Sequence, residues 1–164
     1  MKATPGSEAY AMLVGALLAN LQSHELQLRM FLAEADGDEL EFPKAAGEVV
    51  EETYLTNWMH LRELIETYNE ALGANEVQFK ISGKAAEIRG ALTHGRVLTD
   101  SPVPAPFSLY RFSKPRDGKV IVESITPITD EEVEKDIIFI GQEFYKVAAC
   151  ADQRGYFDST KVGK

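Results

Sequence analysis

Residues 7–34 constrain the fold most, because their apolar side chains recur at three- and four-residue steps along the whole stretch. This spacing places the side chains on one stripe of an α-helix, which has 3.6 residues per turn. Ser7 is a candidate N-cap, and Asp36, Gly37 and Asp38 are expected to stop the helix. The stripe comprises Tyr10, Leu13, Val14, Leu17, Leu18, Leu21, Leu28 and Leu32.

A second helix is expected in residues 56–73, where Thr56 can cap the start and Gly73 suits a left-handed end. Residues 36–52, which precede it, are acidic and are interrupted by glycine and proline. They are therefore expected to form a long loop. The apolar stripe of the second helix comprises Trp58, Leu61, Ile65, Tyr68 and Leu72.

A third helix is expected in residues 79–97, which repeat the same steps. Gly83 and Gly90 weaken such a helix by up to about 1 kcal/mol each relative to alanine. A glycine kept in mid-helix predicts a close backbone approach at Gly90. The stripe comprises Ile81, Ala85, Ile88, Leu92 and Gly95.

A β-hairpin is expected at about 107–126, where apolar and polar residues alternate on both sides of Asp117–Gly118, a strong turn signal. Thr129 and Glu132 then have the spacing of a capping box. The last helix that follows has additional apolar residues beyond one face, so it is either central or shared with another subunit. Its stripe comprises Val133, Ile137, Ile140, Phe144, Val147 and Ala151.

These segments predict a mainly α fold: a helical bundle of about four main helices with a β-hairpin inserted before the last helix. The length of 164 residues favours a single domain, 1–164. The tail, about 156–164, is expected to be disordered.

Composition limits the functional classes. The formal net charge of −9 argues against a general nucleic-acid binder, but leaves open a local basic cleft or a basic partner protein. The chain has no apolar run long enough for a membrane span and no signal peptide at its N-terminus, so we expect a cytoplasmic protein without a membrane partner. Cys150 is the only cysteine, and His24 and His60 have no metal-ligand spacing, so no disulfide, metal or cofactor is expected.

Residues 87–96, "EIRGALTHGR", contain the residue types that RNA cleavage requires. RNA carries its own nucleophile, the ribose 2′-hydroxyl, so an enzyme needs a base such as His94 and a cation such as Arg89 to bind the phosphate. Arg96 could add a phosphate contact. A five-residue step separates Arg89 and His94 by about 140° on an ideal helix, so they converge only at a helix end or with counterparts from a second copy.

The alternative interpretation of this stretch is structural. A histidine in the last turn of a helix is stabilised by the helix dipole, and Gly95 would then be a C-cap. Arg96 would be a solvated charge.

The stretch "IRGALTHGRV" resembles the signature of the HEPN superfamily, in which an arginine is followed after four to six residues by histidine. The resemblance implies a metal-independent endoribonuclease acting on RNA or nucleotide, with Arg89 binding phosphate and His94 as the acid/base group. It also implies a homodimer with a composite cleft, a toxin or phage-defence role, and a possible antitoxin or other partner protein. Glu25 is the candidate carboxylate that orients Arg89; its alternative role is an ion pair with Arg29 at i+4.

The chain departs from that signature at Gly90, where catalytic members commonly have asparagine. A second hypothesis is therefore a non-catalytic HEPN-like interaction or nucleotide-sensing module. His24 could extend the site or be a hydrogen-bonded boundary residue. The basic residues at the hairpin tip (Lys114, Arg116 and Lys119) could contact phosphates, whereas the aromatic residues at helical spacing are expected in the core: Trp58, Tyr68, Phe139 and Tyr145.

Overall fold

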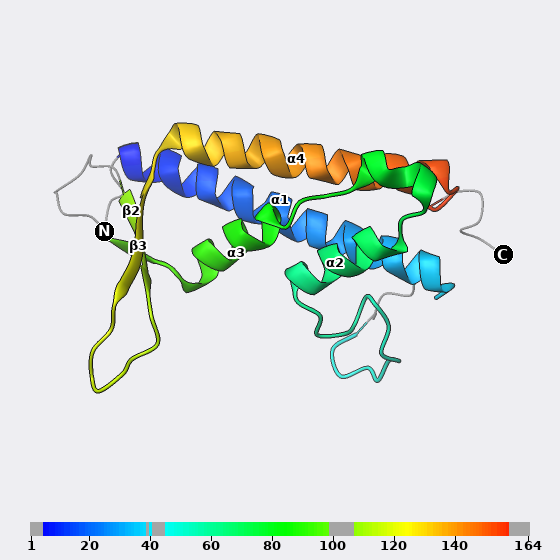
Figure 1. The fold of residues 1–164 in the computed structure, drawn as a ribbon, viewed down its shortest axis with the longest axis horizontal. Coiled ribbons are helices and arrows are strands. Elements are labelled where there is room, and N and C mark those ends of the chain that lie inside the picture. Colours follow the sequence, from blue (N-terminus) through cyan, green and yellow to red (C-terminus); the bar gives the residue numbers. More distant parts are fainter. Residues whose placement is uncertain (1–4, 39, 41–44, 99–106, 158–164) are drawn as a thin grey trace. The chain divides into compact units, whose positions relative to one another are not determined.

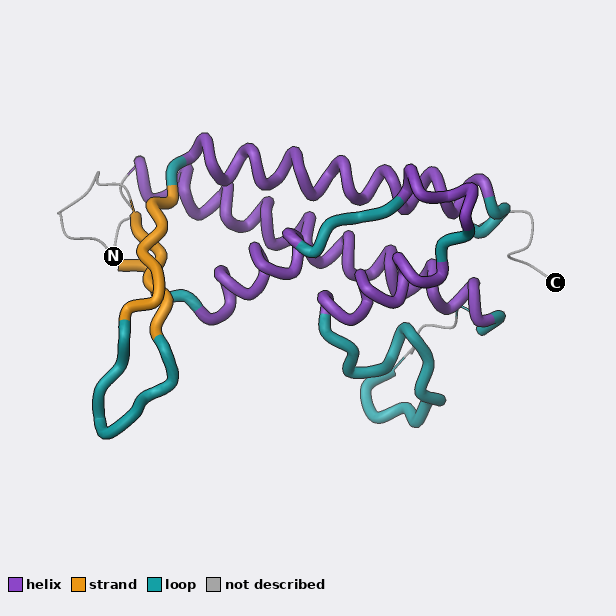
Figure 2. Tube along the Cα trace, viewed as in Figure 1, coloured by secondary structure: helices purple, strands orange, loops and turns teal. Residues whose placement is uncertain are grey.

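The computed structural model describes residues 5–38, 40, 45–98 and 107–157. Within these ranges the chain is mainly α, with an antiparallel hairpin before the last helix, which confirms the predicted class (Figure 1; Figure 2). None of the helices in these ranges combines the length and apolar character that crossing a membrane requires. In order, the elements are α1 (Pro5–Asp36), α2 (Leu61–Ala71), the 3-10 helix η1 (Ala74–Phe79), α3 (Lys84–His94), β1 (Arg96–Leu98), β2 (Phe107–Phe112), β3 (Val122–Ile128) and α4 (Asp130–Gln153).

The chain divides into two compact units. Unit 1 contains Met1–Leu21 and Ala86–Phe139, and unit 2 contains Gln22–Ala85 and Ile140–Lys164. That the two units together form the single domain 1–164 favoured by the chain length stays a prediction.

Unit 2 contains most of the buried apolar side chains that the structure describes. They come from the second part of α1, from one face of α2, from the segment before α3, and from α4 at three- and four-residue steps. Burying each large side chain of this kind stabilises the fold by about 1.5–3 kcal/mol. The largest are Leu28, Phe31, Leu32, Leu61, Leu64, Ile65, Tyr68, Ile81, Ile140 and Val147.

The ends of α1 follow the local sequence in part. At the C-terminal end, Gly37 has a φ of 80° and the amide of Asp38 donates to the carbonyl of Ala33 at 2.8 Å. This left-handed glycine stops the helix as expected. At the other end, the helix already includes Pro5, so Ser7 is not its N-cap.

Helix α2 begins five residues later than the sequence predicts, because a charged side chain holds the preceding loop. The guanidinium of Arg29 donates to the carbonyls of Tyr54, Asn57 and Met59 at 2.9, 3.2 and 2.7 Å. His60 is the N-cap, so the Thr56 cap was wrong. Trp58 lies in this loop and is 93% exposed, and Tyr145 of α4 is 73% exposed, so the predicted place of both rings in the core was also wrong.

Helix α3 is shorter than the predicted third helix, because side chains from other helices bind the backbone before it. The amide of Asn69 donates to the carbonyl of Ile81 at 2.9 Å and accepts from its N–H at 3.0 Å. The Glu143 carboxylate accepts from the backbone N–H of Ser82. Gly73, expected as a left-handed helix end, has a φ of −73° and precedes η1 instead.

The sheet belongs to unit 1 and has the strand order β1-β2-β3, antiparallel throughout. Its hairpin confirms the predicted turn, since Asp117 and Gly118 both have positive φ angles, 51° and 72°. Strand β1 was not predicted, because residues 96 and 97 were assigned to the third helix. At α4, Thr129 Oγ1 accepts from the amide of Glu132 while the Glu132 carboxylate accepts from the amide of Thr129, each at 3.2 Å, which confirms the capping box.

A charged clasp fixes the end of α4 within unit 2. Arg154 Nε donates to Glu76 at 2.8 Å, Nη2 donates to the carbonyl of Ala71 at 2.8 Å, and the guanidinium lies 5.1 Å from the centre of the Phe31 ring. The ring of Tyr156 packs edge-on against Phe31, so the predicted disordered tail does not begin at 156. Residues 158–164 of that tail lie outside the described ranges.

We predict that Glu76→Gln weakens the protein at neutral pH and flattens its acid sensitivity. The bond from Arg154 lowers the pKa of Glu76 from 4.5 to about 2, helped by the Gly73 amide. Because the folded-state pKa is depressed, this stabilisation is present above pH 4.5 and is lost as the pH falls toward 2. The shift corresponds to about 3 kcal/mol in the free energy of unfolding.

Urea unfolding between pH 7 and 2.5 measures this difference. Glu131→Gln is the matched control, since its carboxylate pairs with Lys135 but is 76% exposed. An exposed pair of this kind contributes at most about 1 kcal/mol. If Glu76→Gln and Glu131→Gln lose the same free energy of unfolding, the Arg154–Glu76 pair does not stabilise the fold as proposed.

Candidate functional site

The predicted catalytic residues lie on α3 in unit 1. His94 is the last residue of the helix and is exposed, whereas Arg89 is half-buried. Ile88 is buried beside the arginine, and the hydroxyl of Thr93 donates to the carbonyl of Arg89 at 2.9 Å. The helix therefore ends at the histidine, which is one of the two conditions under which the pair can converge.

Gly95, directly after the helix, is required for a steric reason. Its amide still donates to the carbonyl of Ala91 at 2.8 Å, but the residue does not adopt the left-handed conformation of a C-cap glycine. A Cβ at this position would collide with that carbonyl oxygen and with the side chain of Leu109 on β2. Gly95 is the residue directly after the helix, as the C-cap interpretation has it, but it is not of the left-handed type; a glycine is required there because a strand packs against the helix end.

Gly90, in contrast, has open surroundings. Apart from its chain neighbours and the nearby backbone of its own helix, no described atom lies within 4 Å of a Cβ built at this position. The close backbone approach predicted there does not occur within one copy of the chain.

The predicted substrate-binding residues lie in different units. Glu25, in unit 2, accepts from Arg29 at 3.1 Å, with both side chains mostly buried, so the i+4 ion pair is present. Arg96 opens β1 in unit 1, and its backbone pairs with Tyr110 of β2. The side chain of Arg96 lies outside the described part of the structure.

A buried polar pair in unit 2 was missed by the sequence analysis. His24 is fully buried, and neither ring nitrogen has a hydrogen-bond partner among the described residues, so it is not a hydrogen-bonded boundary residue. Burial lowers the pKa of His24 to about 4, and the nearby Glu143 carboxylate partly opposes that shift. Glu143 is itself buried and bonds Lys146 at 2.7 Å.

The sequence did hold a signal for this pair. His24 lies three residues after Leu21 and four before Leu28, and Glu143 lies three after Ile140 and four before Val147. Both polar residues thus occupy positions on apolar stripes that point into a core.

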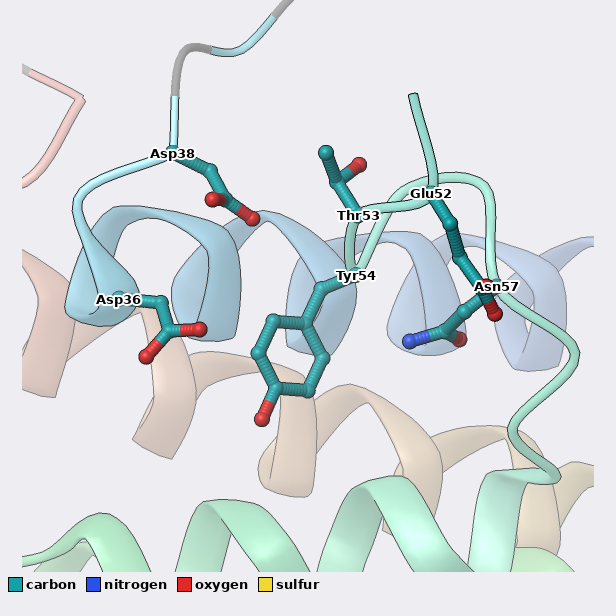
Figure 3. A pocket seen from close by; sticks show the side chains of 6 residues that line it. All are labelled: Asp36, Asp38, Glu52, Thr53, Tyr54 and Asn57. Carbon is teal, nitrogen blue, oxygen red and sulfur yellow. The ribbon is translucent and has the colours of Figure 1, made fainter. Parts of the chain in front are cut away.

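A pocket of about 240 Å³ lies in unit 2, beside the loop that Arg29 holds. Figure 3 shows two carboxylates at the end of α1 and four side chains from the facing loop. Three carboxylates in one pocket repel phosphate, so this pocket does not suit an RNA backbone. None of the predicted site residues lines it; its lining is Asp36, Asp38, Glu52, Thr53, Tyr54 and Asn57.

Among the residues that the structure describes, no group of three or more histidine, cysteine, aspartate or glutamate side chains is placed to hold a metal ion. No family model matches the chain, and neither a curated protein nor a solved structure matches it. Functional inference therefore depends on the residues themselves.

We predict opposite effects from the same substitution at the two motif glycines. Gly90→Ala should raise the free energy of unfolding by up to about 1 kcal/mol, because alanine favours the helix and has room. Gly95→Ala should lower it by about 1–3 kcal/mol, because the strand or the helix end must move. Urea unfolding measures both, and a shift of the same sign in the two variants would refute the close packing at Gly95.

We also predict that His24→Leu removes a loss of stability in mild acid. The wild-type histidine must stay neutral in the folded protein, so the unfolded state gains protons as the pH falls from 6.5 toward 4. The free energy of unfolding of the wild type should fall by up to about 3 kcal/mol between pH 6.5 and 4, and that of the leucine variant should not show this fall. At pH 7.5 the variant should be at least as stable, because no hydrogen bond is lost.

His60→Asn is the control for this measurement, because His60 is exposed and asparagine can replace it as an N-cap. It should leave the pH dependence of unfolding unchanged. A His24→Leu curve parallel to that of the wild type between pH 6.5 and 4 would show that the imidazole is solvated.

Proposed function

We propose that the chain is a metal-independent endoribonuclease of HEPN type that works as a homodimer. The observation that carries the proposal is the motif at the end of α3, with an exposed His94 and a half-buried Arg89. A toxin or phage-defence role, with a partner protein that restrains the nuclease, is the biological setting we propose for it.

In the proposed reaction, the imidazole of His94 takes the proton of the ribose 2′-hydroxyl, and the oxygen attacks the adjacent phosphorus. The bond from phosphorus to the 5′-oxygen breaks, and a protonated histidine of a second copy supplies the proton to that oxygen. Arg89 binds the phosphate and offsets the charge that grows in the transition state. The products are a 2′,3′-cyclic phosphate and a 5′-hydroxyl.

The exposed helix surface of unit 1 supports a dimer. Met12 and Leu18 of α1 and Ile138 of α4 are exposed. Exposed apolar side chains of this kind are typical of a surface that another chain covers. Open space at Gly90, on the motif helix, leaves room for a second backbone.

A second candidate is a HEPN-like interaction or nucleotide-sensing module without catalysis. Gly90 favours it, because glycine offers no side chain to hydrogen-bond at the position after Arg89. This candidate predicts a stable complex with a partner or nucleotide and no cleavage.

We predict that the purified protein cleaves single-stranded RNA in the presence of EDTA. His94→Ala should reduce the rate at least about a hundredfold, because it removes the acid/base group. Arg89→Ala should reduce it by a similar factor, because it removes the cation at the phosphate. Gel assays with end-labelled RNA, and detection of the cyclic phosphate, measure the reaction.

His60→Asn and Arg62→Gln are matched controls, since they change an exposed histidine and an exposed arginine on another helix. They should cleave like the wild type. If all four variants retain the same rate, the cleavage comes from a contaminant; if the wild type does not cleave, the non-catalytic module is the better assignment.

A further inference from the structure

The two faces of the hairpin in unit 1 have different surroundings. Leu109 packs against the end of α3 at Gly95, so its face of β2 is directed toward the helix. Successive residues in a strand point to opposite faces, so Tyr110 and Phe112 lie on the other face. In Figure 2 the two strands continue into a long looped tip, residues 113–121.

That other face carries two aromatic rings in near-parallel orientation. The rings of Tyr110 and Phe112 are 6.2 Å apart between centroids, with 16° between their planes. Their partners on β3, Ile125 and Val122, are 56% and 47% exposed. The face therefore presents half-buried aromatic rings beside exposed aliphatic side chains.

The hairpin is basic within an acidic chain. Residues 107–128 contain four basic and two acidic side chains, a net charge of +2, whereas the rest of the chain carries −11. Arg111 is 3.6 Å from Glu123, so the excess positive charge lies at the tip. Mutual backbone hydrogen bonds of 2.8 and 2.9 Å join Arg116 and Lys119, which fixes two cations on either side of the turn.

The aromatic strand β2 pairs with β1, the strand that follows the motif. Strand β1 begins two residues after His94, and its first residue, Arg96, pairs with Tyr110. Paired residues in adjacent antiparallel strands lie about 4.5–5.5 Å apart between Cα atoms. The aromatic face thus begins within a few residues of the proposed acid/base group.

We propose that this face, which comprises Tyr110, Phe112, Val122 and Ile125, binds single-stranded RNA together with the basic tip residues Lys114, Arg116 and Lys119. Unpaired bases stack on aromatic rings, and the phosphates between them require cations. A strand bound in this way would extend from the tip along β2 as far as Tyr110, which pairs with Arg96, two residues after His94. The inference rests on the proposed function, because it assigns the recognition of that enzyme's substrate.

The test measures binding separately from cleavage. A short fluorescein-labelled 2′-O-methyl oligouridylate cannot be cleaved, because its 2′-oxygen is blocked, and fluorescence anisotropy gives its Kd at several salt concentrations. Tyr110→Leu/Phe112→Leu keeps apolar side chains but removes the planar rings, and should raise the Kd at least about fivefold. Arg116→Gln/Lys119→Gln should weaken binding and reduce the salt slope by about 0.7 for each cation removed.

Tyr145→Leu and Lys135→Gln are the controls, since they change an exposed aromatic ring and an exposed cation on α4. Both should bind like the wild type. The two tip substitutions lie in an exposed turn, so circular dichroism should show unchanged folding.

The outcomes separate the two proposals. If the wild type binds through the hairpin but cleaves no natural RNA, the nuclease fails and the binding face stands. If hairpin variants bind and cleave like the wild type, the binding face fails and the nuclease stands. If the wild type does not bind, and light scattering shows that the tip substitutions dissolve a dimer, the hairpin is a contact with a second copy and the inference is overturned.

Discussion

The contact between Leu109 and Gly95 is the constraint on which the arrangement of unit 1 depends. It lets a strand pack directly against the end of a helix, which is possible only where the helix end has no Cβ. At this contact α3 ends at His94, and β1 begins two residues later, at Arg96. The same contact decides which face of β2 is covered, and therefore that the aromatic rings of Tyr110 and Phe112 lie on the opposite face.

Unit 2 depends on charged side chains that bind backbone groups. Arg29 holds the loop before α2, Glu143 binds the amide before α3, and Arg154 joins η1 to the end of α4. These side chains are buried or half-buried, where an unpaired charge would be costly. Each one therefore fixes a loop in a single position, and the boundaries of the helices follow from where those bonds are made.

This explains how much of the fold could be predicted. Helices α1 and α4, the capping box at Thr129 and the Asp117–Gly118 turn depend on residues close in sequence, and they were predicted correctly except for the N-cap of α1. The start of α3 depends on Asn69 and Glu143, which are distant in sequence, so periodicity alone extended that helix too far. Of the candidate site, the sequence placed the histidine at a helix end, but the packing at Gly95 and the burial of His24 required tertiary structure.

The edge of the sheet indicates why the aromatic face, rather than the strand edge, is the part of the hairpin available for binding. Strand β3 is an edge strand with exposed side chains, which is a hazard for pairing with other chains. It contains Pro127, which cannot donate to a new ladder, and its register is interrupted between Arg111 and Phe112. These features disfavour addition of another strand, whereas a ligand that binds the face with Tyr110 does not need an unpaired strand edge. Single-stranded RNA matches both parts of this surface, because its bases stack on the aromatic rings and its phosphates pair with the basic tip. A second copy of this acidic chain would match only the basic tip.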